Sequence, residues 1–254
     1  MKRLVNVAAL VFVSAVAVQA QTQSPTLFII DDSTVKNSTE GQQGWGDPLA
    51  ELFDSTKIKV VNRARGGRSS RTFQTEGLWD QVLAELKPGD FVLMQFGHND
   101  GGAINDDSRA RGSLKGVGNE VEEIDNLLTR KHEIVHTFGW YMRKYVSDTK
   151  AKGAIPIVIS PVPRNIWTDG KVERRASTYA GWAAEVAKSD KAFFIDLNEI
   201  VAAKYEAIGQ ETVGKDYFKT DHTHTTPLGA KLNAESIAVA LKSLKGCQLA
   251  KYLR

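Results

Sequence analysis

The residues with the clearest chemical potential are a serine near the amino terminus and an acid and imidazole pair near the carboxyl terminus. Ser33 follows an apolar run and two carboxylates, whereas Asp221 lies three residues before His224. A serine hydroxyl becomes a good nucleophile when a base takes its proton, and imidazole titrates in a suitable range. A carboxylate on the same turn can hold one ring nitrogen so that the other faces the serine. We therefore predict Ser33 as nucleophile, His224 as base and Asp221 as orienting acid, with His222 as a less favoured base because it lacks this spacing.

Two further segments could stabilise a reacting carbonyl group. Gly67 lies in an Arg- and Gly-rich segment, and Asn99 lies in the segment Gly97-His98-Asn99-Asp100. A tetrahedral intermediate carries a negative oxygen, which backbone amides at a glycine and a side-chain amide can stabilise. These residue types are also ordinary in turns and helix caps, so each segment alone could be purely structural. Their occurrence in order after successive apolar runs favours an assembled site.

The elements that must position these groups alternate along the chain. Short apolar runs predict strands over residues 26–30, 58–61, 91–96, 155–160 and 193–196. Helical spacing of apolar residues predicts helices over 44–54, 78–86, 133–152 and 179–188, and a last helix capped by Thr226 with Pro227 in its first turn. This alternation predicts an α/β fold, with a five-stranded parallel sheet and helices on both faces. In such a sheet, functional groups collect outside the carboxyl ends of the strands.

Residues 101–130 depart from this pattern. Gly, Asp, Arg and Asn predominate there, and the periodicity of apolar residues is poor. Because the segment lies between core elements, we expect an ordered excursion or lid rather than a linker.

The four functional segments resemble the SGNH (GDSL-type) hydrolase superfamily. The resemblance rests on Asp32-Ser33, Gly67, Gly97-x-Asn99-Asp100 and Asp221-x-x-His224, which occur in the order typical of that superfamily. The longer strings Asp32-Ser33-Thr34-Val35, Gly67-Arg68-Ser69-Ser70-Arg71 and Phe96-Gly97-His98-Asn99-Asp100-Gly101 are similar to the rhamnogalacturonan acetylesterase branch. The resemblance implies a three-layer, flavodoxin-like sandwich and an oxyanion hole made by the amides of Ser33 and Gly67 and the side chain of Asn99. It also implies a serine esterase that removes acetyl groups from pectic rhamnogalacturonan, without a metal or organic cofactor.

The segments that could bind substrate are less specific. Arg68, with Arg71, Arg109 and Arg111, could favour an acidic polymer, although surface arginines are more often simply solvated. Asn165 and Trp167 resemble a glycan-facing loop of the family, and an aromatic ring near a cleft can hold a sugar face. We predict Arg68, Asn165 and Trp167 as substrate-binding residues.

A zinc hydrolase is the main chemical alternative. His132-Glu133-Ile134-Val135-His136 matches H-E-x-x-H, which on a helix would place two imidazoles on one face. The third ligand of the longer motif is missing, because Met142 occupies its position. A second possible metal cluster is His98 with Asp221, His222 and His224, but the predicted triad already uses two of these residues.

One departure from the superfamily affects the nucleophile turn. Asp31 stands where the superfamily usually has glycine, and Arg65 stands where an apolar residue is expected. Asp31 could strain the turn or add a second anion near His224. The alternative hypothesis is therefore a catalytically impaired homologue that only binds glycan.

Composition and the amino terminus indicate an exported protein. Lys2 and Arg3 precede an apolar run from Leu4 to Val18, and Val18-Gln19-Ala20 resembles a cleavage site. We predict a signal peptide over residues 1–20, one hydrolase domain over 21–254, and a periplasmic or secreted location without a membrane anchor. Removal of residues 1–20 lowers the formal net charge from +3 to +1, so nothing indicates a nucleic-acid partner. The single Cys247 cannot form an internal disulfide. The expected partner is an acetylated pectic oligo- or polysaccharide, bound by a monomer.

Overall fold

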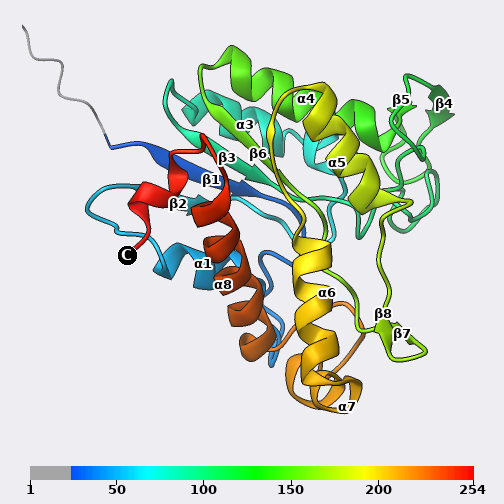
Figure 1. Cartoon of the computed structure of the whole chain (residues 1–254). Helices are drawn as coiled ribbons and strands as arrows, with labels where there is room; N and C mark the ends of the chain where they lie inside the picture. The colour runs from blue at the N-terminus through cyan, green and yellow to red at the C-terminus, as the bar shows by residue number, and fades with distance from the viewer. Residues whose placement is uncertain (1–23) are drawn as a thin grey trace, which may run out of the picture.

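Five parallel strands form the central sheet of the protein (Figure 1). The computed structural model describes residues 24–254, so the predicted signal peptide lies outside the described residues. The strands are β1 (Thr26–Ile30), β2 (Lys59–Asn62), β3 (Phe91–Met94), β6 (Ile155–Ile159) and β9 (Phe193–Ile195). Their order is β2-β1-β3-β6-β9, and every pairing is parallel. The predicted α/β fold with a five-stranded parallel sheet is confirmed.

Helices cover both faces of this sheet. Successive side chains of a strand point to opposite faces, and Leu27 and Ile29 accordingly pack in one core cluster while Phe28 and Ile30 pack in the other. The first cluster lies under α1 (Gly46–Glu51), α6 (Leu197–Ile208) and α8 (Pro227–Ser243). The second lies under α2 (Ser70–Thr75), α3 (Leu78–Glu85), α4 (Phe138–Ala151) and α5 (Tyr179–Ser189). Strands buried on both faces explain why the sheet segments are continuous apolar runs.

Smaller elements complete the described chain. They are the antiparallel pairs β4 (Val121–Asp125) with β5 (His132–His136) and β7 (Trp167–Thr168) with β8 (Lys171–Val172), α7 (Gln210–Thr212), a π-helical turn at Val213–Tyr217 and a 3-10 turn at Leu249–Tyr252. Within residues 24–254, no helix is both long and apolar enough to cross a membrane.

The cap of the last helix follows the sequence prediction. The Thr226 hydroxyl accepts a hydrogen bond from the amide of Gly229 at 3.4 Å, and Pro227 occupies the first turn of α8. Thr226 lies two residues after His224, so the start of α8 fixes the end of the segment that contains Asp221 and His224. This segment lies at the carboxyl edge of the sheet, where His224 contacts Ser33.

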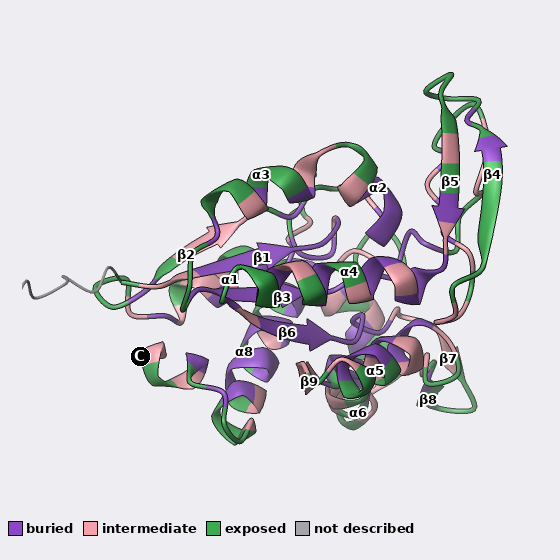
Figure 2. Cartoon of the chain, turned by 90° about the horizontal axis from the view of Figure 1, so that it is seen from above, coloured by how far each residue is buried: buried purple, intermediate pink, exposed green. Residues whose placement is uncertain are grey.

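The predicted helix over residues 133–152 is wrong at its start. Residues 132–136 form the strand β5, which pairs with β4 in an antiparallel hairpin, and α4 begins only at Phe138, with Thr137 as its cap. The apolar residues Ile134 and Phe138 match helical spacing, but a pairing partner 11 residues earlier in the chain overrides that local pattern. Figure 2 shows the hairpin standing out from the body beside α2 and α4. The predicted excursion is thus built partly as an ordered hairpin.

The strand order creates a crevice at the carboxyl end of β1. The chain moves outward from β1 to β2 and then returns past it to β3, so the connections leave β1 in opposite directions. Such a reversal opens a crevice outside the carboxyl ends of the strands. Ser33 follows β1 and Asn99 follows β3, which brings both residues to this crevice.

Candidate active site

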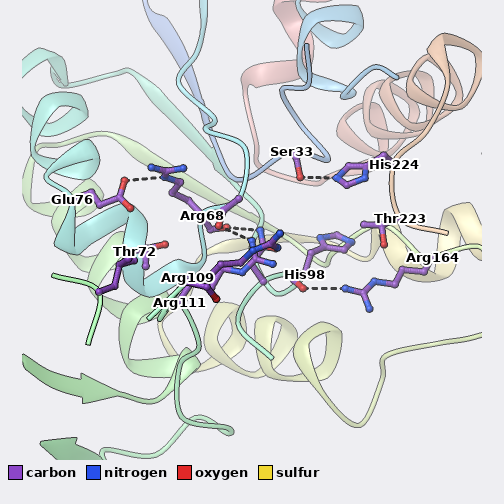
Figure 3. A pocket seen from close by; sticks show the side chains of 14 residues that line it. Ser33, Arg68, Thr72, Glu76, His98, Arg109, Arg111, Arg164, Thr223 and His224 are labelled. Carbon is purple, nitrogen blue, oxygen red and sulfur yellow. Dashed lines mark hydrogen bonds and ion pairs between the residues drawn. The ribbon is translucent and has the colours of Figure 1, made fainter. Parts of the chain in front are cut away.

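Ser33, His224 and Asp221 form a continuous hydrogen-bonded relay. The Ser33 Oγ lies 2.9 Å from His224 Nε2 (Figure 3). On the other side of the ring, His224 Nδ1 lies 2.7 Å from Asp221 Oδ2. When Nδ1 carries the proton and donates it to Asp221, Nε2 is free to accept the proton of Ser33. The structure therefore places His224, and not His222, against Ser33. This is the arrangement of a nucleophile, a base and an orienting acid.

The turn that holds His224 is anchored to the loop after Ser33. Gln43 and Thr225 pair through their backbones, with the Gln43 amide 2.8 Å from the Thr225 carbonyl oxygen. The Thr225 hydroxyl donates a second hydrogen bond to the carbonyl oxygen of Gln43 at 2.9 Å. In addition, Gln42 Nε2 lies 3.4 Å from Asp221 Oδ2. Two segments 182 residues apart in the chain are thus held together.

Asp221 is strongly biased toward its charged form. Partial burial opposes ionisation, but hydrogen bonds from the His224 side chain and from the amides of His224 and Thr223 outweigh it and lower the pKa of Asp221 to about 2. The two amide donors lie 2.7 Å and 2.6 Å from Oδ1. The carboxylate is therefore charged at neutral pH and able to stabilise an imidazolium on His224.

Two backbone amides at the crevice are free to donate. Among residues 24–254, the amides of Ser33 and Gly67 have no hydrogen-bond acceptor in the protein. Both residues line the same cleft as His224. Gly67 has a φ of +80°, a backbone conformation that a side chain would strain. These amides are suitable donors to a developing oxyanion.

The side chain of Asn99 is also at the cleft, but its two amide hydrogens have protein acceptors. Its Nδ2 donates to Asp32 Oδ2 at 3.0 Å and to the carbonyl oxygen of Arg68 at 2.8 Å. Since a side-chain amide has only two hydrogens, Asn99 would have to share or exchange one of these bonds to reach an oxyanion. Its position therefore fits the predicted role, with an exchange that the sequence did not indicate.

Asp31 is a buried carboxyl that does not strain the turn. It is fully buried, its φ is not in the left-handed region, and its Oδ2 accepts hydrogen bonds from Gln95 Nε2 and, at 3.3 Å, from the Thr34 hydroxyl. Burial, and then the neighbouring charge of Asp32, raise the pKa of Asp31 well above its usual value. Burial thus disfavours the charged form of Asp31. The backbone of Asp31 is unstrained, and its raised pKa opposes a second anion near His224.

Asp32 serves the same turn in a different way. Its Oδ1 accepts from the amide and the hydroxyl of Thr34 at 2.8 Å and 2.9 Å, while its Oδ2 holds Asn99. Burial raises the pKa of Asp32, and the hydrogen bonds from Thr34 oppose that rise. Asp32 therefore links the nucleophile turn to the loop that follows β3.

His98 is not a second base for Ser33. It is buried, and its Nε2 lies 3.0 Å from the carbonyl oxygen of Val162, so that nitrogen carries the hydrogen in the neutral ring. Burial, and then the charges of Arg175 and Arg164, lower the pKa of His98 well below its usual value. His98 therefore stays neutral and forms part of the cleft wall.

The cleft beside Ser33 is open and cationic. Its volume is about 530 Å³, and its walls include four arginines, namely Arg68, Arg109, Arg111 and Arg164 (Figure 3). Arg68 is paired with Glu76 at 2.8 Å, whereas the other three have no carboxylate within 4.0 Å in the described part of the chain. An anionic ligand would be attracted to this wall.

The hypothesis of a zinc site at the H-E-x-x-H segment is wrong on geometry. On the strand β5, His132 and His136 are separated by four residues, or about 13 Å, which is too far for one ion. Glu133 points to the opposite face of that strand from both histidines, and its carboxylate pairs with Arg71 at 2.6 Å. Within residues 24–254, no group of three or more His, Cys, Asp or Glu side chains is placed to hold a metal ion, which includes the alternative cluster around His98.

The comparisons with known proteins agree with this geometry. Residues 29–232 match the model of the GDSL-like Lipase/Acylhydrolase family. The chain belongs to this family. It is 32% identical over 216 residues to rhamnogalacturonan acetylesterase from Emericella nidulans, a match that covers 85% of this chain and 84% of that protein. It is 30% identical over 225 residues to the probable rhamnogalacturonan acetylesterase YesY from Bacillus subtilis, covering 86% and 93% of the two chains.

Solved structures show the same fold. Protein YxiM from Bacillus subtilis superposes on this chain with a TM-score of 0.70 at 27% identity, over 87% of this chain and 57% of that one. Axe2, an acetylxylan esterase from Geobacillus stearothermophilus, superposes with a TM-score of 0.52 at 19% identity, over 85% and 93% of the chains. The family match and the two relatives named rhamnogalacturonan acetylesterases show that the protein is a carboxylic ester hydrolase.

Several predicted substrate residues of this GDSL-family esterase lie elsewhere. Arg71 is fully buried, where its guanidinium holds Glu133 and donates to the carbonyl oxygens of Ile104 and Gly112, both at 2.8 Å. The interpretation of Arg71 as a residue facing an acidic polymer is therefore wrong. Arg71 instead anchors the excursion that carries Arg109 and Arg111 to the cleft.

Asn165 and Trp167 do not line the cleft. Trp167 Nε1 donates to Asn165 Oδ1 at 2.7 Å, the Asn165 amide donates to the carbonyl oxygen of His222 at 2.8 Å, and the Trp167 ring packs against the core. These contacts support the turn before His224. Arg164, which sequence reasoning missed, is the residue of this loop that lines the cleft. Only its neighbouring prolines and its place after a strand could have indicated it.

Proposed function

We propose that this esterase removes acetyl groups from an acetylated pectic polysaccharide, with Ser33 as nucleophile. The observation that carries the proposal is the Ser33, His224 and Asp221 relay, which opens on a cleft walled by arginines. The relay suits acyl transfer, and the wall suits a polymer that bears carboxylates. The names of the two relatives from Emericella nidulans and Bacillus subtilis support rhamnogalacturonan as the polymer.

The proposed reaction has two halves. Ser33 Oγ attacks the acetyl carbonyl carbon as its proton moves to His224 Nε2, and the carbonyl oxygen becomes an oxyanion near the amides of Ser33 and Gly67. The bond to the sugar oxygen then breaks, and that oxygen takes the proton from His224. In the second half a water molecule gives a proton to His224 and attacks the acetyl-serine, which releases acetate and restores the Ser33 hydroxyl.

Asp221 and Asn99 have supporting roles in this scheme. The charged Asp221 stabilises the imidazolium that exists between the two proton transfers. Asn99 exchanges its bond to Asp32 or to the carbonyl oxygen of Arg68 for one to the oxyanion. An amide that is already oriented by two acceptors needs little reorganisation to do so.

Release of acetate from a panel of acetylated polymers tests the proposal. Wild type and Ser33→Ala are compared on acetylated pectic fragments, acetylated xylan and a lipid ester. We expect the wild type to prefer the pectic fragments and Ser33→Ala to lose nearly all of that release. Equal rates for the two proteins would rule out Ser33 as nucleophile, and a preference for xylan or lipid would rule out the pectic substrate. In keeping with the amino-terminal sequence, we also propose that the enzyme works outside the cytoplasm.

A further inference from the structure

We propose that the esterase binds one acidic sugar chain across Ser33, with carboxylate-bearing units in two separate grooves on either side of the nucleophile. The inference rests on the proposed function and extends it, because it assigns a second binding groove and an internal rather than terminal acetylated unit.

Ser33 lies between two hollows rather than at the end of one. The first is the arginine-walled cleft of about 530 Å³ already described. The second, which we call the rear groove, has a volume of about 670 Å³ and is lined by Lys36, Asn37, Gln42, Asn62, Arg63 and Arg65. Ser33, Gly67 and His224 line both hollows. A ligand that places an ester on Ser33 can therefore continue in two directions.

Two glycines lie beside Ser33 where the two hollows meet. Gly66 lines the rear groove, and Gly67 lines both hollows. A methyl group added at Gly66 would lie 3.6 Å from the Cβ of Ser33, in van der Waals contact with the nucleophile. A methyl group at Gly67 would lie 3.6 Å from the guanidinium of Arg111. A chain can thus cross the nucleophile close to the backbone of these two glycines.

The rear groove carries its own unpaired cations. Lys36 and Arg65 are exposed, and neither has a carboxylate within 4.0 Å in the part of the chain that the structure describes. Arg63 is paired with Glu85, and Asp47, the one carboxylate on the groove wall among residues 24–254, accepts a hydrogen bond from Asn62 at 2.8 Å. The net charge of the rear groove is therefore positive, as is that of the arginine-walled cleft.

The remaining polar groups of the rear groove suit sugar hydroxyls. Asn37 Nδ2 donates to Gln42 Oε1 at 2.8 Å, and Asn37 Oδ1 accepts from the Thr39 amide at 2.9 Å, which leaves the second Asn37 hydrogen and one lone pair of Oδ1 for other partners. Because Gln42 also reaches Asp221, a ligand in this groove lies against the residues that hold the catalytic turn. A uronate unit carries hydroxyls and one carboxylate. Amide side chains can bind the hydroxyls, and cations without a carboxylate partner can bind the carboxylate.

Variants on the two sides of Ser33 test the proposal. Arg65→Gln represents the rear groove, Arg109→Gln represents the arginine-walled cleft, and Lys59→Gln is the matched control, because it removes a cation at the amino end of β2, away from both grooves. The substrates are long acetylated pectic fragments, with free carboxylates or after methyl esterification of those carboxylates.

We expect each of the two groove variants to raise the KM for the free-acid fragments by about five- to tenfold at low salt, which corresponds to one charge-assisted contact. The double variant should show the product of the two effects. The difference between the groove variants and Lys59→Gln should vanish on the methyl-esterified fragments and shrink at high salt. An effect of Arg65→Gln that is the same on both kinds of fragment would overturn carboxylate recognition in the rear groove.

Binding separates this inference from the proposed function. The wild type and the three variants are titrated calorimetrically with de-acetylated pectic fragments, which need no catalysis. Weaker binding by both Arg65→Gln and Arg109→Gln supports the two grooves even if acetate release fails. Acetate release that depends on Ser33, together with unchanged binding and KM in Arg65→Gln, would overturn the rear groove alone and leave the proposed function in place.

Discussion

The pKa values of aspartates on the two sides of Ser33 are shifted in opposite directions. On the sheet side, Asp31 and Asp32 are fully buried, and burial raises the pKa of both. On the side of the carboxyl-terminal turn, the Asp221 side chain is 38% exposed, and hydrogen bonds lower its pKa to about 2. The buried carboxyls hold the geometry of the turn at Ser33, whereas the exposed one pairs with His224. Solvent access thus distinguishes the carboxyl groups that support the turn from the one that is charged beside His224.

The largest effect should come from removing the charge on the exposed side. Asp221→Asn keeps the shape of the turn but favours the wrong tautomer of His224, so kcat should fall by about 10⁴. Steady-state kinetics on a small acetyl ester measures this fall, and circular dichroism checks that the fold is unchanged. A loss of less than tenfold in a folded variant would mean that charge at Asp221 is not what drives His224.

A buried ion pair should matter more for stability than an exposed one. Arg71→Met leaves two carbonyl oxygens without their donor and Glu133 with only its hydrogen bond from Asn126, and removal of one partner of a buried pair typically costs about 3–5 kcal/mol. Arg68→Met, whose partner Glu76 is half-exposed, is the control and should cost at most about 1 kcal/mol of unfolding free energy. Urea denaturation of both variants measures the difference. Equal costs would show that burial of Arg71 adds nothing.

The amide of Asn99 should affect rate more than stability. Loss of one oxyanion donor typically lowers kcat by about 10² to 10³, or roughly 2.7 to 4 kcal/mol. Asn99→Ala should therefore fold and bind substrate with little change in KM, but turn over slowly. If kcat stays near that of the wild type, the hydrogen bonds of Asn99 to Asp32 and Arg68 are its whole role.

The smallest effects should be opposite pH dependences of stability. Because the pKa of Asp31 is raised in the folded state, the folded protein holds this proton more tightly, and its stability falls as pH rises above the unfolded pKa of about 4. Asp31→Asn should remove this fall and gain stability relative to the wild type as pH rises. The pKa of Asp221 is lowered, so its stabilising contribution is present above pH 4 and is lost as pH falls toward 2.

Urea titrations between pH 2 and pH 8 measure both dependences. After allowance for solvent screening, the Asp221 contribution should not exceed about 1 kcal/mol. Parallel slopes for Asp31→Asn and Asp221→Asn would show that the two environments do not differ as described.

The local pattern of apolar and polar residues was sufficient to predict the strands of the sheet and the positions where they end. The apolar runs at Leu27–Ile30 and 155–160 needed only their composition to indicate strands buried on both faces, and the polar residues after each run marked the carboxyl edge. Pattern was insufficient at residues 132–136, where helical spacing suggested a helix and pairing with Val121–Asp125 produced a strand. Short segments take the structure that their tertiary partner allows, because local propensity is weak compared with packing and ladder hydrogen bonds.

Residue types and their order along the chain were enough to indicate Ser33, Asp221 and His224, because nucleophile, base and acid are chemically distinctive. Only the tertiary structure decided which arginines and carboxyl groups are buried and which reach the cleft, because the sequence does not distinguish them. Arg71 became a buried anchor while Arg109 reached the cleft, and Asp31 became a buried carboxyl while Asp221 kept its charge. The reason is physical: the role of an ionisable side chain depends on its distance from water and from its partners, and contacts between residues far apart in the chain set both.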